Sequence, residues 1–237
     1  MENINIIDLK KTKIAIFGDS VSKGIVYDDI KKKYRKVKKN FVDIISESKG
    51  LVIDNLSKFG CTVSKGIEIF RKNVDKIENC SIVVLEFGGN DCNFKWSEIA
   101  RDPYAEHESA VPPERFREEY ERLIKAVKAA NCVPVLLSLP PIDYLRFFEW
   151  VSQGLSRENI LKFLGNKDFI YRWHEMYNDI IFDLAQRESV MVLDIRRIFL
   201  SHRNIQDYIC TDGMHPNEKG HELISKALLD CGLIPDL

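Results

Sequence analysis

The chain has 237 residues, a net charge of −1, and 45% hydrophobic and 30% charged residues. This composition is typical of a globular protein with a sizeable core, and the length suits one large α/β domain or two small ones. A charge so close to zero argues against a general affinity for nucleic acid or for an anionic membrane surface.

No targeting or membrane segment is apparent in the sequence. The N-terminal stretch MENINIIDLKKTK lacks the basic region and the longer apolar core of a secretory signal. The longest apolar stretches, residues 82–87 and 133–139, are too short to span a bilayer. The cysteines show neither a Cys-x-x-Cys pair nor a zinc-like spacing, so we expect reduced thiols, no bound metal and a cytoplasmic location. These cysteines are Cys61, Cys80, Cys92, Cys132, Cys210 and Cys231.

Five short apolar runs recur along the chain, at residues 13–17, 51–54, 81–87, 133–139 and 190–195. They are rich in Val, Ile and Leu without strict alternation, as is typical of strands buried on both faces. Helical spacing of apolar residues precedes the second, third and fourth runs, in residues 41–45, 63–74 and 116–127. This order predicts an α/β fold, with a doubly wound five-stranded parallel sheet and helices on both faces. Because no linker or internal repeat interrupts it, we expect one domain over residues 1–237.

Two connections are longer than usual, at about residues 92–113 after the third strand and 142–170 after the fourth. The second contains apolar residues at helical spacing, which predicts two short helices. Both inserts leave the C-terminal edge of the sheet, where open α/β sheets bind their ligands. Two interpretations stay open for each insert: an apolar wall or cover for a substrate, or a small unit that packs its own aromatic side chains.

Residues 31–39, KKKYRKVKK, carry seven basic residues in nine. Such a run indicates either a patch for phosphate or nucleic acid, or a solvated loop that leads into a helix. No aromatic platform or nucleic-acid module accompanies the run, so the second interpretation is favoured and we expect no nucleic-acid partner.

The first apolar run ends at Gly18 and places Asp19 and Ser20 just beyond the C-terminal end of its strand. Ser20 is therefore a candidate nucleophile. A serine hydroxyl is inert at its own pKa, so it needs a base, a group that orients the base, and donors for the developing oxyanion.

A candidate base stands near the C-terminal end of the chain. Asp212 and His215 are three residues apart across Gly213, so a tight turn can bring the carboxylate to imidazole Nδ1 and leave Nε2 to face a hydroxyl. Pro216 then suits the first turn of the last helix. The other histidines have no acidic residue spaced to orient them, and we expect surface or packing roles for them. They are His107, His174, His202 and His221.

Two further strand ends offer oxyanion donors. Gly60, after the second run, can bring a bare backbone N–H close to a substrate, and Asn90, after Gly88 and Gly89, offers a side-chain amide. Each segment alone is an ordinary turn. Together they carry weight, because all of these segments leave parallel strands at one edge of one sheet.

In this order and on these strands, the segments resemble the SGNH hydrolases, also called the GDSL lipase/acylhydrolase superfamily. The matching blocks are Gly18-Asp19-Ser20, Gly60, Gly88-Gly89-Asn90-Asp91 and Asp212 to His215. The resemblance implies a flavodoxin-like three-layer α/β/α sandwich. It implies Ser20 as nucleophile, His215 as base and Asp212 as the residue that orients the base. It also implies an oxyanion hole formed by the Ser20 and Gly60 N–H groups and the Asn90 side chain.

The resemblance also implies an activity, that of a serine esterase that cleaves a small-molecule carboxylic ester through an acyl-enzyme, without a cofactor. An acyltransferase or a non-catalytic small-molecule binder on the same fold is the alternative. A metallophosphoesterase would need an Asp-x-His after the first strand, which this chain lacks. A flavin or nucleotide binder would be indicated by Gly-x-Gly-x-x-Gly or a P-loop, and neither pattern is present. Val21 stands where many family members have leucine, and the long inserts leave the substrate open.

Overall fold

The structure, a computed structural model, describes residues 13–77 and 80–230. Cys231 and most of the N-terminal stretch discussed above lie outside the described residues. The other five cysteines are buried free thiols. Within the described part of the chain, no helix is long and apolar enough to cross a membrane.

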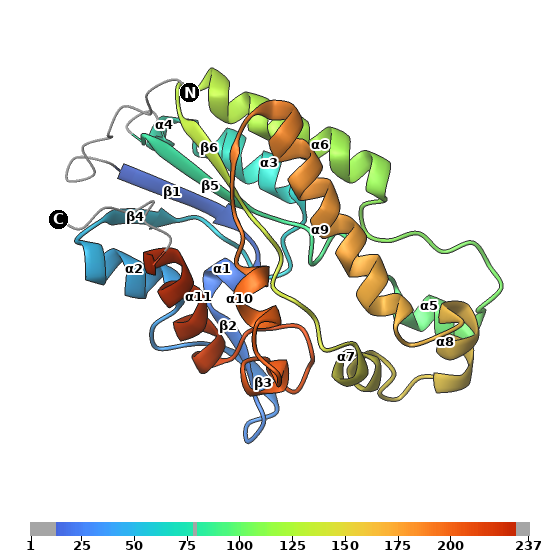
Figure 1. The fold of residues 1–237 in the computed structure, drawn as a ribbon. Coiled ribbons are helices and arrows are strands. Elements are labelled where there is room, and N and C mark those ends of the chain that lie inside the picture. Colours follow the sequence, from blue (N-terminus) through green and yellow to red (C-terminus); the bar gives the residue numbers. More distant parts are fainter. Residues whose placement is uncertain (1–12, 78–79, 231–237) are drawn as a thin grey trace.

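A five-stranded parallel sheet forms the centre of the molecule, as predicted (Figure 1). The strand order is β4-β1-β5-β6-β7, so the chain starts near the middle and winds toward both edges. All five predicted strands are present, with ends that differ by one or two residues. Their bounds are β1 Lys13–Gly18, β4 Val52–Asn55, β5 Ile82–Glu86, β6 Val133–Leu137 and β7 Met191–Leu193.

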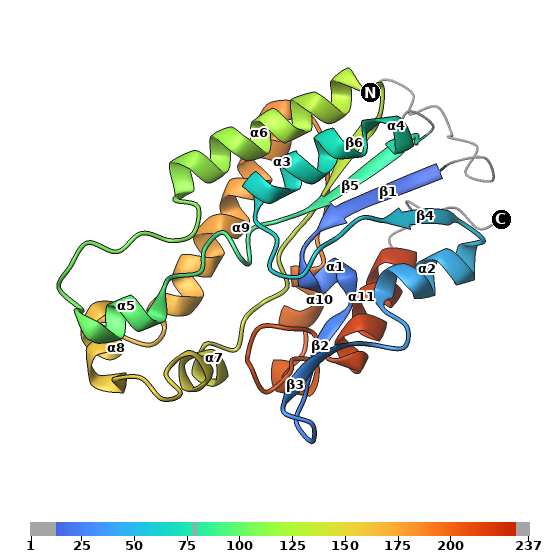
Figure 2. The same cartoon turned by 180° about the vertical axis from the view of Figure 1, so that it is seen from behind.

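Helices cover both faces of the sheet and complete three layers (Figures 1 and 2). On β1, Ala15 and Phe17 point to one face and Ile14 and Ile16 to the other, and each pair belongs to a separate apolar core. The first core is closed by α3 (Val63–Lys72), α6 (Pro113–Ala129) and α9 (Phe169–Glu188). The second is closed by α2 (Phe41–Lys49), α10 (Arg196–Leu200) and α11 (Glu218–Asp230). These layers confirm the predicted α/β fold class.

Local sequence signals set the ends of these helices. Asn40 caps α2 by accepting from the Asp43 N–H, while the Asp43 carboxylate accepts from the Asn40 N–H, which is a capping box. Gly50 ends the helix in a left-handed conformation. The short helix α4 (Val74–Ile77) follows α3 directly.

The basic segment at residues 31–39 differs in part from its prediction. Its centre is a strand and not a loop: β2 (Ile25–Asp28) and β3 (Lys33–Lys36) pair as an antiparallel hairpin, with Tyr27 opposite Tyr34. Its end leads into α2, as predicted. The physical reason is packing: both tyrosine rings meet Trp150 edge-on, and Val26 and Val37 are buried with Cys210. The lysines of the segment are all exposed, and their number obscures the strand pattern in the sequence.

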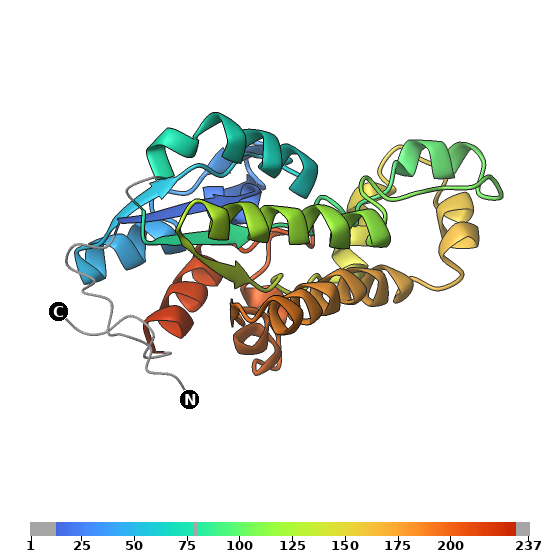
Figure 3. The ribbon, with the colours of Figure 1, turned by 90° about the horizontal axis from the view of Figure 1, so that it is seen from above.

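The two inserts fold into short helices that pack together beyond one end of the sheet (Figure 3). They contain α5 (Trp96–Arg101), α7 (Tyr144–Val151) and α8 (Arg157–Leu164), the last two as predicted. Their side chains form a third apolar core, which includes Phe94, Phe147, Phe148 and Ile170. A single domain with inserts at these places stays a prediction.

The last helix begins later than predicted. Pro216 pairs with Ile209 in an isolated β-bridge, and α11 starts at Glu218. Asn217 supplies the helix start instead, because its side chain accepts from the Gly220 N–H. A 3-10 helix, η2 (Ile205–Asp207), precedes this segment.

Candidate active site

Ser20 lies at a sharp turn between β1 and the short helix α1 (Ser20–Lys23). The Asp19 side chain caps this helix by accepting from the Val21 N–H at 2.8 Å. Gly18 is required at the end of the strand, since a Cβ there would lie 2.7 Å from Glu86 Oε2 and 3.0 Å from the Glu86 carbonyl oxygen. The turn therefore presents the Ser20 hydroxyl at the C-terminal edge of the sheet.

His215 lies opposite Ser20, in the tight turn that the Asp-x-x-His spacing predicts. Asp212 Oδ1 accepts from the Met214 and His215 N–H groups at 3.0 and 3.1 Å, which closes the turn. Gly213 has φ +78°, and a Cβ there would lie 2.3 Å from the Phe147 nitrogen. Only glycine fits this position, because α7 packs directly against the turn.

The three polar side chains form one hydrogen-bonded row. His215 Nε2 lies 2.8 Å from Ser20 Oγ, and His215 Nδ1 lies 2.6 Å from Asp212 Oδ2. Burial acts to raise the pKa of Asp212, but hydrogen bonds from His215 and Met214 outweigh it and hold the pKa below its ordinary value. Asp212 is thus a buried carboxylate that accepts from Nδ1–H and leaves Nε2 free to accept from the serine hydroxyl.

The two candidate oxyanion donors line the same cavity as Ser20. Gly60 has φ +67°, and its N–H makes no hydrogen bond to another described residue. The Ser20 N–H is equally unpaired within the described chain. Asn90 is half-buried, and its Nδ2 donates to Asp19 Oδ2 at 2.7 Å. One N–H of the Asn90 amide is thus engaged, and the amide has a second to offer.

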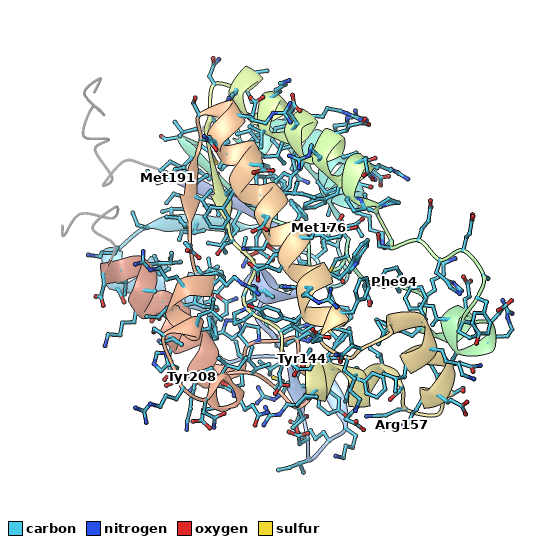
Figure 4. The ribbon with its side chains drawn as sticks, turned by 45° about the vertical axis from the view of Figure 1, so that its right-hand side comes forward. Phe94, Tyr144, Arg157, Met176, Met191 and Tyr208 are labelled. Atoms are coloured by element: carbon cyan, nitrogen blue, oxygen red, sulfur yellow. The ribbon has the colours of Figure 1, made fainter. Side chains whose placement is uncertain are left out.

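A cavity of about 230 Å³ opens beside Ser20 and is walled mainly by aromatic side chains of the two inserts and α9. Phe94, labelled in Figure 4, lies 5.2 Å from Trp173 and 5.3 Å from Phe163, measured between ring centroids. The inserts therefore pack their own aromatics and wall the cavity, so both interpretations of them hold. The other apolar wall residues include Trp96, Phe147, Leu164, Phe169 and Ile170.

Two aromatic residues beside His215 were not predicted. The Tyr34 ring lies 5.2 Å from the imidazole, edge-on, and the Phe59 ring stacks on it at 6.3 Å. Burial, followed by the charge of Asp212 and a hydrogen bond to it, raises the pKa of Tyr34, so its hydroxyl stays neutral. The signal that could have found Tyr34 is its place in the β3 strand, opposite Tyr27.

His174 also belongs to the cavity wall rather than only to a packing site. It is buried on α9, and its Nδ1 lies 3.5 Å from Arg196 Nη1. Burial and the Arg196 charge lower the pKa of His174 to about 3. The ring is therefore neutral, and its hydrogen-bond partner is a cation rather than a carboxylate that could orient a base. Among the described residues, no group of three or more His, Cys, Asp or Glu side chains could hold a metal ion.

Comparison with known proteins identifies the class that this fold and site define. The sequence profile of the GDSL-like lipase/acylhydrolase family matches residues 16–223. The chain therefore belongs to this family, which confirms the resemblance and places the protein among hydrolases that act on esters. No curated protein sequence matches the chain.

Solved structures share the fold at low sequence identity. The lipase/acylhydrolase from Enterococcus faecalis is 18% identical with a TM-score of 0.66, over 93% of this chain and 95% of that one. LAE5, an α/β hydrolase enzyme from the Lake Arreo metagenome, is 19% identical with a TM-score of 0.65, over 92% and 94%. The esterase EstA from Pseudoalteromonas sp. is 18% identical with a TM-score of 0.60, over 92% and 95%. At these identities the likeness is one of fold.

Proposed function

We propose that this protein is a serine esterase that hydrolyses carboxylic esters through a covalent acyl-enzyme. The observation that carries the proposal is the row Ser20, His215 and Asp212, with hydrogen-bond distances of 2.8 and 2.6 Å, whose serine and histidine line an apolar cavity. A serine hydroxyl with an oriented base and nearby N–H donors is the arrangement that acyl transfer requires.

In this mechanism, His215 Nε2 takes the proton from Ser20 Oγ as the oxygen attacks the ester carbonyl carbon. The oxyanion that forms accepts from the unpaired N–H groups of Ser20 and Gly60 and from the second N–H of the Asn90 amide. His215 then returns the proton to the leaving alcohol oxygen, which gives an ester on Ser20. Water, deprotonated by His215, attacks this ester; the bond to Ser20 Oγ then breaks as His215 gives that oxygen its proton, and the acid is released.

The surroundings of His215 indicate how the substrate lies. The leaving alcohol must depart beside His215, where Tyr34 and Phe59 flank the ring and Phe59 is half exposed to solvent. The acyl group then enters the part of the cavity that is lined by apolar side chains, including Phe94 and Trp173. Since a cavity of ~150 Å³ can hold benzene, about 230 Å³ suits an acyl group of roughly six to ten carbons.

A panel of p-nitrophenyl esters graded by acyl length tests this proposal. We expect kcat/KM to rise by up to about fourfold per CH₂ from acetate to hexanoate, because each buried CH₂ contributes ~0.8 kcal/mol. It should fall for palmitate, which the cavity cannot enclose. Rates that increase steadily through palmitate would contradict the assigned acyl site. Repeating the panel with an added acceptor alcohol separates hydrolysis from acyl transfer, and the absence of turnover would favour a binding protein.

Asn90→Ala should lower kcat for the best ester by about 10²–10³ and leave KM nearly unchanged, because an oxyanion donor acts mainly in the transition state. Steady-state kinetics of the purified variant measure both constants. Asn93→Ala is a matched control, since Asn93 lines the same cavity but its side chain accepts from Trp96 Nε1. A raised KM with an unchanged kcat in Asn90→Ala would instead assign Asn90 to substrate binding.

A further inference from the structure

Two buried carboxyl groups behind Ser20 have no part in the mechanism above. Asp19 directly follows β1, and Glu86 is the last residue of the neighbouring parallel strand β5, where it is the register partner of Gly18. Asp19 is 3% exposed and Glu86 is fully buried. Such groups are costly to bury as charges, so their position directly behind a candidate nucleophile requires an explanation.

Asp19 connects the nucleophile turn to the candidate oxyanion hole. Its Oδ1 accepts from the Val21 N–H at 2.8 Å, and its Oδ2 accepts from Asn90 Nδ2 at 2.7 Å. The second distance is that of a hydrogen bond to a charged acceptor. A terminal amide is planar, so fixing one N–H on Asp19 also fixes the direction of the other. Asp19 therefore determines where the free Asn90 N–H points.

Glu86 fits beside Asp19 as a neutral acid. Its Oε2 accepts from the Asp19 N–H at 3.1 Å and from the Ser22 hydroxyl at 3.0 Å, whereas its buried Oε1 has no hydrogen-bond partner among the described residues. Burial and the Asp19 charge raise the pKa of Glu86 well above its ordinary value. Burial raises the pKa of Asp19 too, but the Val21 N–H, His215, Glu86 and Asn90 all oppose that shift.

Burial and the repulsion between the two carboxylates favour a pair that holds one proton. Burial, with a contribution from the Asp19 charge, also raises the pKa of the nearby buried Asp91 to about 7. The charge therefore belongs on Asp19, which holds the Asn90 and Val21 donors and faces His215. The proton belongs on Glu86, because its Oε1 accepts from no described group and so loses no hydrogen bond when it is protonated.

We propose that Asp19 is a positioning residue for Asn90, whose amide its carboxylate aims at the developing oxyanion, and that Glu86 stays a neutral acid so that Asp19 alone carries the charge. The role of Asn90 on which this depends is that of the proposed esterase mechanism. Asp19 touches no reacting atom, and its effect on the rate passes through Asn90.

A double-mutant cycle tests the coupling. Asp19→Asn keeps an oxygen for the Val21 N–H but removes the charge that holds Asn90, and should lower kcat by about 10- to 100-fold with little change in KM. In the Asn90→Ala background, the same change should alter kcat by less than about twofold, because residues that act as one unit are not additive. Ser22→Ala, which removes a Glu86 contact without touching Asn90, should combine multiplicatively with Asn90→Ala. If the losses of Asp19→Asn and Asn90→Ala multiply, the proposal is overturned.

Glu86→Gln tests the protonation state. Glutamine is the neutral isostere, so kcat should stay within about threefold of the wild type. The pKa of Glu86 is raised in the folded state above its ordinary value of about 4.5. Glu86 therefore stabilises the fold at a pH below about 4.5, and this contribution is lost as the pH rises through the folded-state pKa. The free energy of unfolding of Glu86→Gln, relative to the wild type, should therefore increase with pH. A loss of activity equal to that of Asp19→Asn would overturn the neutral assignment.

One readout does not depend on turnover. The side-chain amide of Asn90, assigned in a ¹H–¹⁵N spectrum by its absence in Asn90→Ala, should show one proton shifted downfield by the carboxylate, and Asp19→Asn should abolish that shift. An unchanged Asn90 amide overturns the positioning role even in an active enzyme. A wild-type protein without esterase activity contradicts the proposed function, while this spectrum still decides whether Asp19 holds Asn90.

Discussion

Ser20→Ala should reduce kcat/KM for the best ester of the panel by about 10⁴-fold or more, the loss expected when a triad nucleophile is removed. Ser20 Oγ lies 2.8 Å from His215 Nε2, and the change deletes only this one oxygen. Alanine suits the first position of a helix, so the thermal unfolding transition should be nearly unchanged. Initial rates at several enzyme concentrations, with the uncatalysed rate subtracted, measure the loss.

A matched control lies two residues further along the same turn. Ser22 is as buried as Ser20, but its hydroxyl donates to Glu86 and does not contact His215. Ser22→Ala should keep activity within about threefold of the wild type. Equal losses in the two variants would indicate that the turn, and not the Ser20 hydroxyl, is what activity needs.

Asp212→Asn should lower kcat by about 10⁴-fold with the fold retained. Asp212 Oδ2 accepts from His215 Nδ1 at 2.6 Å, and an asparagine amide turned toward Nδ1 would donate instead. The imidazole would then carry its proton on Nε2 and could not accept the proton of Ser20. Because the pKa of Asp212 lies below its ordinary value, the wild-type residue stays a carboxylate wherever the imidazole is neutral.

Asp207→Asn is the control for this change. Asp207 lies in the same C-terminal region and is exposed, and its carboxylate accepts from Asn204 Nδ2 on the surface. Its replacement should leave kcat unchanged within about twofold. Near-wild-type kcat in Asp212→Asn, with the variant confirmed by mass, would mean that Asp212 does not orient the base.

The central sheet could be predicted because its signal is local. The inner strands β1, β5 and β6 are largely buried, and that burial leaves their runs apolar except at the ends. The edge strands β4 and β7 are partly exposed, but each still begins as a short apolar run. The hairpin of β2 and β3 could not be predicted in this way. Its packing depends on residues that are distant in the chain. Tyr27 and Tyr34 meet Trp150, more than a hundred residues away, and Val26 is buried with Cys210.

The polar groups of the candidate site also differ in whether a local sequence signal reveals them. Ser20, Asp212 and His215 meet because a strand end and a tight turn fix them locally. The sequence predicts only a surface or packing role for His174. Its place in the cavity wall follows from the three-dimensional path of α9, which the sequence does not reveal. Glu86 stands out in the sequence, because a carboxylate in a run predicted to be buried on both faces requires a hydrogen-bond partner. That partner, the Asp19 N–H, is found only when β1 and β5 are paired.

Covalent labelling of the nucleophile tests the central claim most directly. A phosphonate with a leaving group on phosphorus reacts covalently with an activated serine, so it marks the nucleophile. The protein is incubated with an ethyl fluorophosphonate, digested, and analysed by tandem mass spectrometry, with Ser20→Ala and Ser22→Ala in parallel. The account predicts one adduct per chain, on Ser20, in the wild type and in Ser22→Ala, and none in Ser20→Ala. An adduct on another residue, or unchanged labelling of Ser20→Ala, would contradict it.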